Sequence, residues 1–287
     1  MNILVTSAAL DGKGYSAILT FSRDGEALGT FGSGCVITDP RGLHVHPNGE
    51  RIYVNNGDDR VLSLDRSGGV VAETATITPF DPGGGNFGLD DRYYAGSRAT
   101  RTILAFPADL QSAGEAIVPS GIVSFPRGFA FAADGRFFFA AGAGPSGLGA
   151  NTILAFAPDL TLQAERFVDD PELSPLDLTI GPNGNILASS EFPFGNPDAV
   201  TTIREYDSET GRLARVLSPD QSVGFRNPRG LRLGPDGNLY CVARDEVVAF
   251  DLNDGAFLGA VVRLERLNGQ AIEFFPSVAV SEVVPVA

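Results

Sequence analysis

One short pattern recurs along the chain and constrains the fold more than any other feature. Each copy starts with a proline, runs through alternating apolar residues to a glycine turn, and ends in a second apolar run. The copies are PRGLHVHPNGERIYV from Pro40, PRGFAFAADGRFFFA from Pro126, PLDLTIGPNGNILAS from Pro175 and PRGLRLGPDGNLYCV from Pro228. Asn-Gly and Asp-Gly between apolar runs favour a type I′ turn, which needs positive φ at both central residues. The pattern therefore predicts four β-hairpins.

Each hairpin is followed by further strand-like segments. A third apolar run follows, such as RVLSLD at 60–65 or EVVAFD at 246–251, and a fourth follows in several copies, such as GRLARVLS at 211–218. A degenerate fifth copy, PGGGNFGLDDRYYAG, starts at Pro82. Successive units are 42, 44, 49 and 53 residues apart, starting at Pro40, Pro82, Pro126, Pro175 and Pro228. Four strands at such a period predict the blades of a β-propeller.

The two ends of the chain are predicted to build a sixth blade together. Residues 1–32 contain three strand-like segments, NILVTSA, SAILTFS and EALGTFG, and lack a first strand. The segment FPSVAVSE at 275–282 has the alternation to supply it. Such a composite blade would close the ring and leave no sheet edge open. We therefore expect a single all-β domain over 1–287, a six-bladed propeller of four-stranded antiparallel blades.

The unit PRGLxxxPNGxxYV, followed by RVLSLD and a glycine turn, resembles an NHL-type repeat. The whole chain is similar to six-bladed propellers of the streptogramin-lyase and gluconolactonase-like kind. The resemblance implies a ligand face formed by the loops that enter first strands and those that join second to third strands. Enzymes, extracellular binding modules and scaffolds share this pattern, so it implies the fold more specifically than the function.

The residue after each repeat proline is expected at the mouth of the central channel. These residues are Arg41, Gly83, Arg127, Leu176 and Arg229, with Ser277 expected from the composite blade. Arginines on alternate blades would bring three guanidinium groups together, which suits a carboxylate, phosphate or enolate. Alternatively, each arginine pairs with a nearby acid such as Asp39 or Asp81, and no ligand site results.

A second polar layer is expected three residues further along the first strands. Its members are His44, Asn86, Thr179 and Arg232. Asp177 adds a carboxylate near the mouth, where other copies have glycine. A neutral imidazole near a carboxylate and an arginine can carry general acid–base catalysis, so His44 and Asp177 are the catalytic candidates. His44 could instead pack between blades, hydrogen-bonded and inert.

Two long loops, 140–151 and 189–200, are expected on the ligand face, where loop insertions give propellers their specificity. The second loop carries Phe192 and Phe194 beside Glu191, and these rings would pack the apolar part of a substrate. The same loops could instead form a rim for protein docking.

The resemblance also raises metal chemistry, although the residues match it incompletely. Streptogramin-type lyases use channel-mouth histidines with magnesium, whereas this chain has two histidines, of which only His44 lies near the mouth. Gluconolactonase-like hydrolases hold a divalent metal with Glu, Asn and Asp side chains. That set could be imitated by Glu191, Asn196, Asp177 and Asn86. No cofactor is firmly implied, and oxygen ligands would favour Ca²⁺ or Mg²⁺ over Zn²⁺.

Composition excludes some partners. The formal net charge is −14, which disfavours nucleic acid as a partner. The chain shows no signal-peptide pattern and no stretch long enough for a membrane span, so we expect a cytoplasmic monomer, or a mature secreted form if a leader was removed. Cys35 and Cys241 are far apart in sequence, which argues for free thiols.

Two functions from different classes follow from these residues. In the first, the protein is a lyase or a lactone/ester hydrolase for a small molecule with an anionic or oxygen-rich group. The arginines, Arg232 included, would hold that group while His44 and Asp177 transfer protons. In the second, the propeller is non-catalytic and binds a protein or peptide on the same face. Scaffolding propellers are commonly fused to another domain, and this sequence shows no additional domain. We therefore favour the enzyme.

Overall fold

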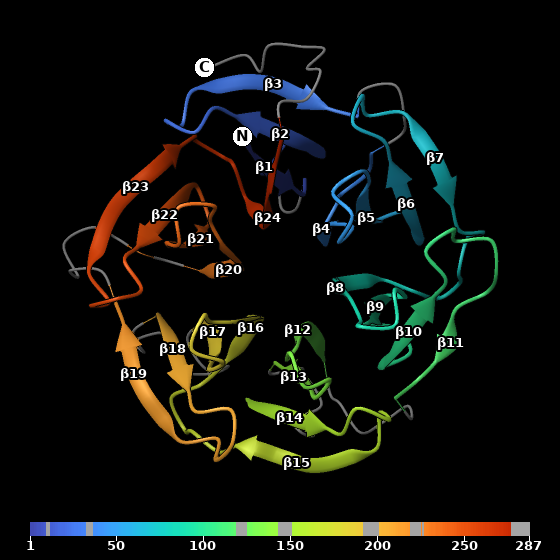
Figure 1. Cartoon of the computed structure of the whole chain (residues 1–287). Coiled ribbons are helices and arrows are strands. Elements are labelled where there is room, and N and C mark those ends of the chain that lie inside the picture. The colour runs from blue at the N-terminus through green and yellow to red at the C-terminus, as the bar shows by residue number, and fades with distance from the viewer. Residues whose placement is uncertain are drawn as a thin grey trace.

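The structure is a computed structural model that describes residues 1–9, 12–32, 37–118, 125–142, 151–191, 201–218, 225 and 227–276. These residues form six four-stranded sheets arranged around a central axis (Figure 1). Neighbouring strands within each sheet run antiparallel, as β5 (Ile52–Asn56) does to both β4 (Leu43–Val45) and β6 (Arg60–Leu64). The prediction of an all-β, six-bladed propeller is therefore confirmed.

Five blades are built from continuous stretches of chain, each from the innermost strand outward. Blade 2 consists of β4 (Leu43–Val45), β5 (Ile52–Asn56), β6 (Arg60–Leu64) and β7 (Val70–Glu73). Blade 3 consists of β8 (Pro82–Phe87), β9 (Tyr93–Ser97), β10 (Thr102–Phe106) and β11 (Glu115–Ala116). Blade 4 consists of β12 (Pro126–Phe131), β13 (Phe137–Ala141), β14 (Thr152–Phe156) and β15 (Leu162–Val168). Blade 5 consists of β16 (Pro175–Ile180), β17 (Ile186–Ser190), β18 (Thr202–Tyr206) and β19 (Leu213–Leu217). Blade 6 consists of β20 (Pro228–Leu233), β21 (Leu239–Ala243), β22 (Glu246–Phe250) and β23 (Phe257–Arg263).

Blade 1 joins the two ends of the chain, as expected. It contains β1 (Asn2–Ser7), β2 (Ala17–Phe21) and β3 (Ala27–Phe31), with β24 (Gly269–Phe275) as its innermost strand. The register pairs Asn2 with Phe275 and Ser7 with Gly269.

The position of the closing strand differs from the prediction. We expected it at 275–282, whereas the structure places it at Gly269–Phe275. The proline that marks other first strands is replaced here by Gly269, because a Cβ at this position would overlap the side chain of Val242. The sequence marker was therefore missing at the true start of the strand. Residues 277–282 lie outside the described part of the chain.

A bulge shapes the start of each proline-led inner strand. The register shifts between Pro126 and Phe129 in β12, and between Pro228 and Leu231 in β20. The residue after the proline is thereby released from the regular ladder, which is how β-bulges re-aim side chains. In both of these strands the next residue is glycine, because neighbouring inner strands approach closely. A Cβ on Gly230, for example, would lie 2.6 Å from Ala271 Cα. The recurring Pro-Arg-Gly is thus explained by close packing around the axis.

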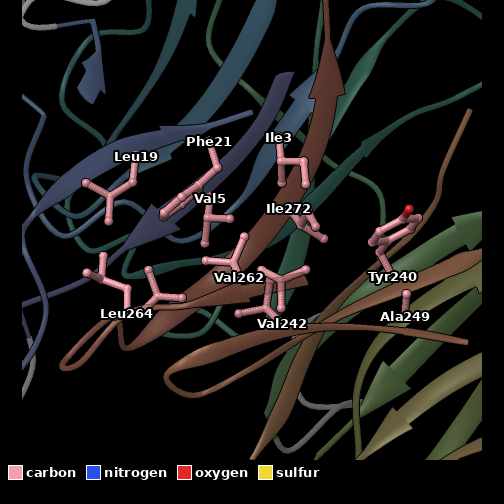
Figure 2. Close-up of a cluster of buried hydrophobic side chains, with 12 residues drawn as sticks. Ile3, Val5, Leu19, Phe21, Tyr240, Val242, Ala249, Val262, Leu264 and Ile272 are labelled. Atoms are coloured by element: carbon pink, nitrogen blue, oxygen red, sulfur yellow. The ribbon is translucent and has the colours of Figure 1, made fainter. Parts of the chain in front are cut away.

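The hydrophobic core lies between blades rather than at the channel. One cluster joins Ile3, Val5 and Leu19 of blade 1 to Val242 and Val262 of blade 6, with Ile272 of β24 packed between them (Figure 2). All six side chains are almost fully buried. This cluster fastens the last blade to the first, so it stabilises the closed ring.

The two remaining sequence expectations concern thiols and membranes. Cys241 is a buried free thiol in β21, and burial raises its pKa. Cys35 lies outside the described residues. Within the described ranges, no helix is long and apolar enough to cross a membrane.

Replacing Ile272 with alanine should lower the free energy of unfolding by about 2–4 kcal/mol, because it leaves a cavity at the closing seam. Chemical denaturation measures this change. The control Val71→Ala shortens a half-exposed side chain of β7 and should change stability by less than about 0.5 kcal/mol. Equal effects of the two substitutions would contradict the closing role of β24.

Candidate functional site

A cavity of about 300 Å³, which we call the channel-mouth cavity, opens where the inner strands begin. Its charged and aromatic lining comes from the side chains of Arg41, His44, Arg98, Phe125, Arg127, Asp177, Glu191 and Arg229. Every residue expected at the mouth in blades 2 to 6 lines it, namely Arg41, Gly83, Arg127, Leu176 and Arg229. In blade 1 the lining residues are Gln270 and Ala271, because the closing strand starts at Gly269. Ser277, expected in that place, lies outside the described residues.

The three expected arginines are only partly paired. Arg41 Nη2 lies 3.9 Å from Asp81 Oδ1, and Arg127 Nη2 lies 3.6 Å from Glu191 Oε1. Arg229 donates from Nη1 to the amide oxygen of Gln270. Among the residues that the structure describes, none forms a hydrogen bond with the buried Nε atoms of Arg41 and Arg127. Such orphaned donors are uncommon in folded proteins and call for a ligand or another explanation.

Ion pairs with Asp39 and Asp81 therefore neutralise little of the positive charge of the three arginines. Asp39 accepts a hydrogen bond from the backbone N–H of Ala9 at 2.7 Å. Asp81 makes its closer ion pair with Arg98.

Arg98 is a fourth cation that the sequence analysis missed. It follows β9, in the loop that leads to β10, and lines the same cavity. Its guanidinium lies 5.4 Å from the ring centroid of Phe125, and that of Arg127 lies 4.4 Å from the same ring. Loops between second and third strands were expected on this face, so the position of Arg98 could have revealed it.

Burial and mutual repulsion raise the free energy of the charged forms of these arginines. Burial and the neighbouring Arg98 charge lower the pKa of Arg41 to about 10. Burial also lowers the pKa of Arg127 to about 10, against the opposing effect of Glu191. Both side chains remain charged at neutral pH, and their charge is poorly compensated. An anion bound here would relieve that cost.

A second layer of charged groups lies below the mouth. Arg232 of β20 places Nε 2.8 Å from Glu273 Oε1 of β24, and its Nη2 donates to His44 Nδ1 of β4 at 2.9 Å. Because a guanidinium only donates, His44 Nδ1 must accept, and the neutral ring carries its proton on Nε2. Burial and the Arg232 charge hold the pKa of His44 well below its usual value. Glu273 was missed because the closing strand was expected further along the chain.

Asp177 connects two blades through its carboxylate. Oδ1 accepts the N–H of Leu178 at 3.0 Å, and Oδ2 accepts the N–H of Leu231 in β20 at 2.9 Å. Burial raises the pKa of this carboxyl. Asp177 occupies the place of the small residue in other inner strands, and its side chain lies against Gly128. It lines the cavity with both oxygens engaged by backbone.

The other predicted site residues lie deeper or outside the described ranges. Asn86 donates from Nδ2 to the carbonyl of Phe129 at 3.1 Å, which joins blade 3 to blade 4. Thr179 is partly buried in β16. Neither residue lines the cavity, and nor does Arg232. Phe192, Phe194 and Asn196 lie outside the described residues.

A divalent cation does not fit this mouth. Among the described residues, no group of three or more His, Cys, Asp and Glu side chains is arranged to hold a metal ion. Glu191 faces Arg127, and Asp177 accepts from two backbone amides. Four guanidinium groups around the cavity would repel Ca²⁺ or Mg²⁺. Of the ligand set considered from the resemblance, Glu191 and Asp177 are engaged by these partners, Asn86 does not line the cavity, and Asn196 lies outside the described residues.

Comparison with solved structures places the fold among both enzymes and binding modules. A chain from a nidogen/laminin complex has a TM-score of 0.73 at 14% identity, covering 94% of this chain and 97% of that one. A streptogramin B lyase has a TM-score of 0.57 at 17% identity, covering 75% of this chain and 66% of the lyase. A putative gluconolactonase has a TM-score of 0.59 at 20% identity, covering 79% and 78%.

The expected likeness to lyase and gluconolactonase propellers is confirmed at the level of fold. Lyases, lactonases and non-catalytic binders share this architecture. No family model matches the chain, and no curated protein matches it. Function must therefore be argued from the cavity itself.

Replacing Arg41 with glutamine should leave the free energy of unfolding unchanged or raise it by up to about 1 kcal/mol at low salt. The substitution removes repulsion from neighbouring arginines and sacrifices only a 3.9 Å ion pair. Denaturation in buffer without multivalent anions measures the change, which should shrink as salt is added. A loss above about 1 kcal/mol would show that Arg41 is satisfied internally.

Stability should fall on acidification partly because of His44. Its pKa in the folded protein lies below the unfolded value, so below about pH 6.5 the unfolded chain takes up a proton that the folded chain refuses. This group contributes a loss of up to about 1.4 kcal/mol per pH unit below that point. His44→Gln should flatten the stability profile between pH 7 and pH 5. The raised pKa values of Asp177 and Glu273 act in the opposite direction in both proteins. Parallel profiles would contradict the assignment.

Proposed function

We propose that the protein binds a small molecule at the channel-mouth cavity through an anionic group and acts on it as a lyase or a lactone/ester hydrolase. The observation that supports this most is that the buried Nε atoms of Arg41 and Arg127, in an open cavity, have no hydrogen-bond partner within the described part of the chain. A ligand oxygen would satisfy these donors and offset the repulsion between the arginines.

Of the lyase and hydrolase reactions, the lyase reaction, an elimination, uses the residues that line the cavity most directly. Glu191 would remove a proton next to the substrate carbonyl or carboxylate. The electron pair would then develop on oxygen as an enolate, held by the guanidinium groups of Arg41 and Arg127. As the enolate collapses, the double bond forms and the leaving group departs from the neighbouring carbon.

His44 and Asp177 have different tasks in this proposal. His44 is neutral with its proton on Nε2, so it donates a hydrogen bond to the leaving group, and the proton that Glu191 removed passes to that group as its bond breaks. Asp177 holds the N–H of Leu231 and thereby fixes the start of β20 next to β16. It acts as a positioning residue for the mouth.

The second candidate is a non-catalytic propeller that binds a protein or peptide on the same face. The likeness to a chain of the nidogen/laminin complex supports it, since that likeness spans 94% of this chain. In that case the arginines would recognise acidic side chains of a partner.

The ion pair between Arg127 and Glu191 permits a test in which two substitutions have opposite effects. Arg127→Gln should weaken binding of benzoate, citrate or inorganic phosphate, because it removes a donor. Glu191→Gln should strengthen binding, because it removes the competing carboxylate 3.6 Å away. Calorimetry measures both changes.

Thermal unfolding gives a second readout of the same binding. A ligand at 100 times its dissociation constant adds about 2.7 kcal/mol to stability. The control Arg23→Gln changes an exposed arginine paired with Asp236 and should bind like the parent. If none of the anions binds the parent protein, the small-molecule proposal is refuted and the protein-binding candidate takes its place.

A further inference from the structure

The channel mouth carries more positive charge than its acidic neighbours balance. Four guanidinium groups line it, those of Arg41, Arg98, Arg127 and Arg229. Within 4 Å, the described residues offer them two carboxylates. Asp81 is shared by Arg41 and Arg98, and Glu191 faces Arg127. Arg229 contacts the neutral amide of Gln270. The mouth therefore has an excess of two positive charges.

The layer below does not cancel this excess. Arg232 and Glu273 pair with each other at 2.8 Å, and His44 is neutral. Asp177 is the remaining carboxylate among the described lining residues. Its oxygens accept from the N–H groups of Leu178 and Leu231, and within 4 Å the ion pairs of the four guanidinium groups are made with Asp81 and Glu191 instead. The mouth thus keeps its excess charge.

The positions of the cations suit a group with oxygens in several directions. Arg41, Arg98, Arg127 and Arg229 come from blades 2, 3, 4 and 6, so they surround the axis rather than line one wall. Stacking on Phe125 holds Arg98 and Arg127 in place before a ligand arrives. A planar carboxylate presents two oxygens in one plane, whereas a tetrahedral phosphate presents three terminal oxygens around an axis.

The rest of the cavity can hold a small organic group. Its volume of about 300 Å³ exceeds what a phosphate alone needs, and Phe125, Pro126 and Leu176 give it apolar walls. The cavity therefore offers room for the organic part of an ester beside its charged group.

We infer that the channel-mouth cavity selects a doubly charged phosphate monoester over a singly charged anion of the same shape. This inference rests on the proposed capture of an anionic group at the same cavity. A singly charged ligand would leave one buried positive charge without a partner, whereas a dianion matches the excess of two.

Phenyl phosphate and phenyl sulfate provide a matched pair of probes. They share a ring and a tetrahedral group, but the sulfate ester carries one charge at every pH used. Phosphate monoesters lose their second proton near pH ~6. At pH 8 and constant ionic strength, phenyl phosphate should bind the full chain at least about tenfold more tightly by calorimetry. At pH 5 the two affinities should converge. Protonation of His44, Asp177, Glu191 or Glu273 would act on both probes, so the ratio reports the charge of the ligand.

Variants and a carboxylate probe separate the outcomes. Arg41→Gln should reduce the ratio at pH 8, whereas the surface control Arg23→Gln should preserve it. Equal affinities for the two probes, or binding of benzoate without phenyl phosphate, would overturn the selection for a dianion and leave anion capture intact. No binding of any of the three would overturn both proposals.

Discussion

The pairing of β24 with β1 is the contact on which the rest of the structure depends. It turns a linear series of hairpins into a closed ring, and it lets a cluster around Ile272 and Val242 fasten blade 1 to blade 6. Hydrogen bonds alone would close the sheet weakly, since each exchanges with water for a small net gain. The buried apolar seam adds the larger stabilisation, and the pairing covers the edge of β1 that would otherwise be open.

Closure also assembles the charged groups of the channel. Gln270 and Glu273 reach the axis only because β24 is the innermost strand of blade 1. Gln270 then contacts Arg229 of β20, and Glu273 neutralises Arg232, which in turn fixes the tautomer of His44. The glycines that let the inner strands approach one another directly follow the arginines. Close packing of these strands therefore also brings the arginine side chains together around the axis.

The sequence predicted what short-range physics determines. Proline, alternation and Asn-Gly or Asp-Gly turns located the hairpins, and the period located five of the six first strands. Arg41, Arg127 and Arg229 followed from that register. The sequence did not predict Gly269 as the start of β24, because the proline that marks other inner strands is absent there. A side chain at this position would overlap Val242. Gln270 and Glu273 were missed with it. The hydrogen bonds that engage Asp177 depend on how close β20 lies, which no local pattern records.

The site includes residues of β24, the strand that completes blade 1. Its rim includes Arg229 from blade 6, Gln270 from the closing strand and Arg41 from blade 2, so no single hairpin can form it. During synthesis, β1 to β3 are made before β24 and remain without an inner partner until β24 is made. The cavity is therefore complete only when β24 has docked, and an anion that enters it would hold β24 next to blades 2 and 6. Binding of a ligand at the channel mouth and the stability of the closed ring are therefore linked.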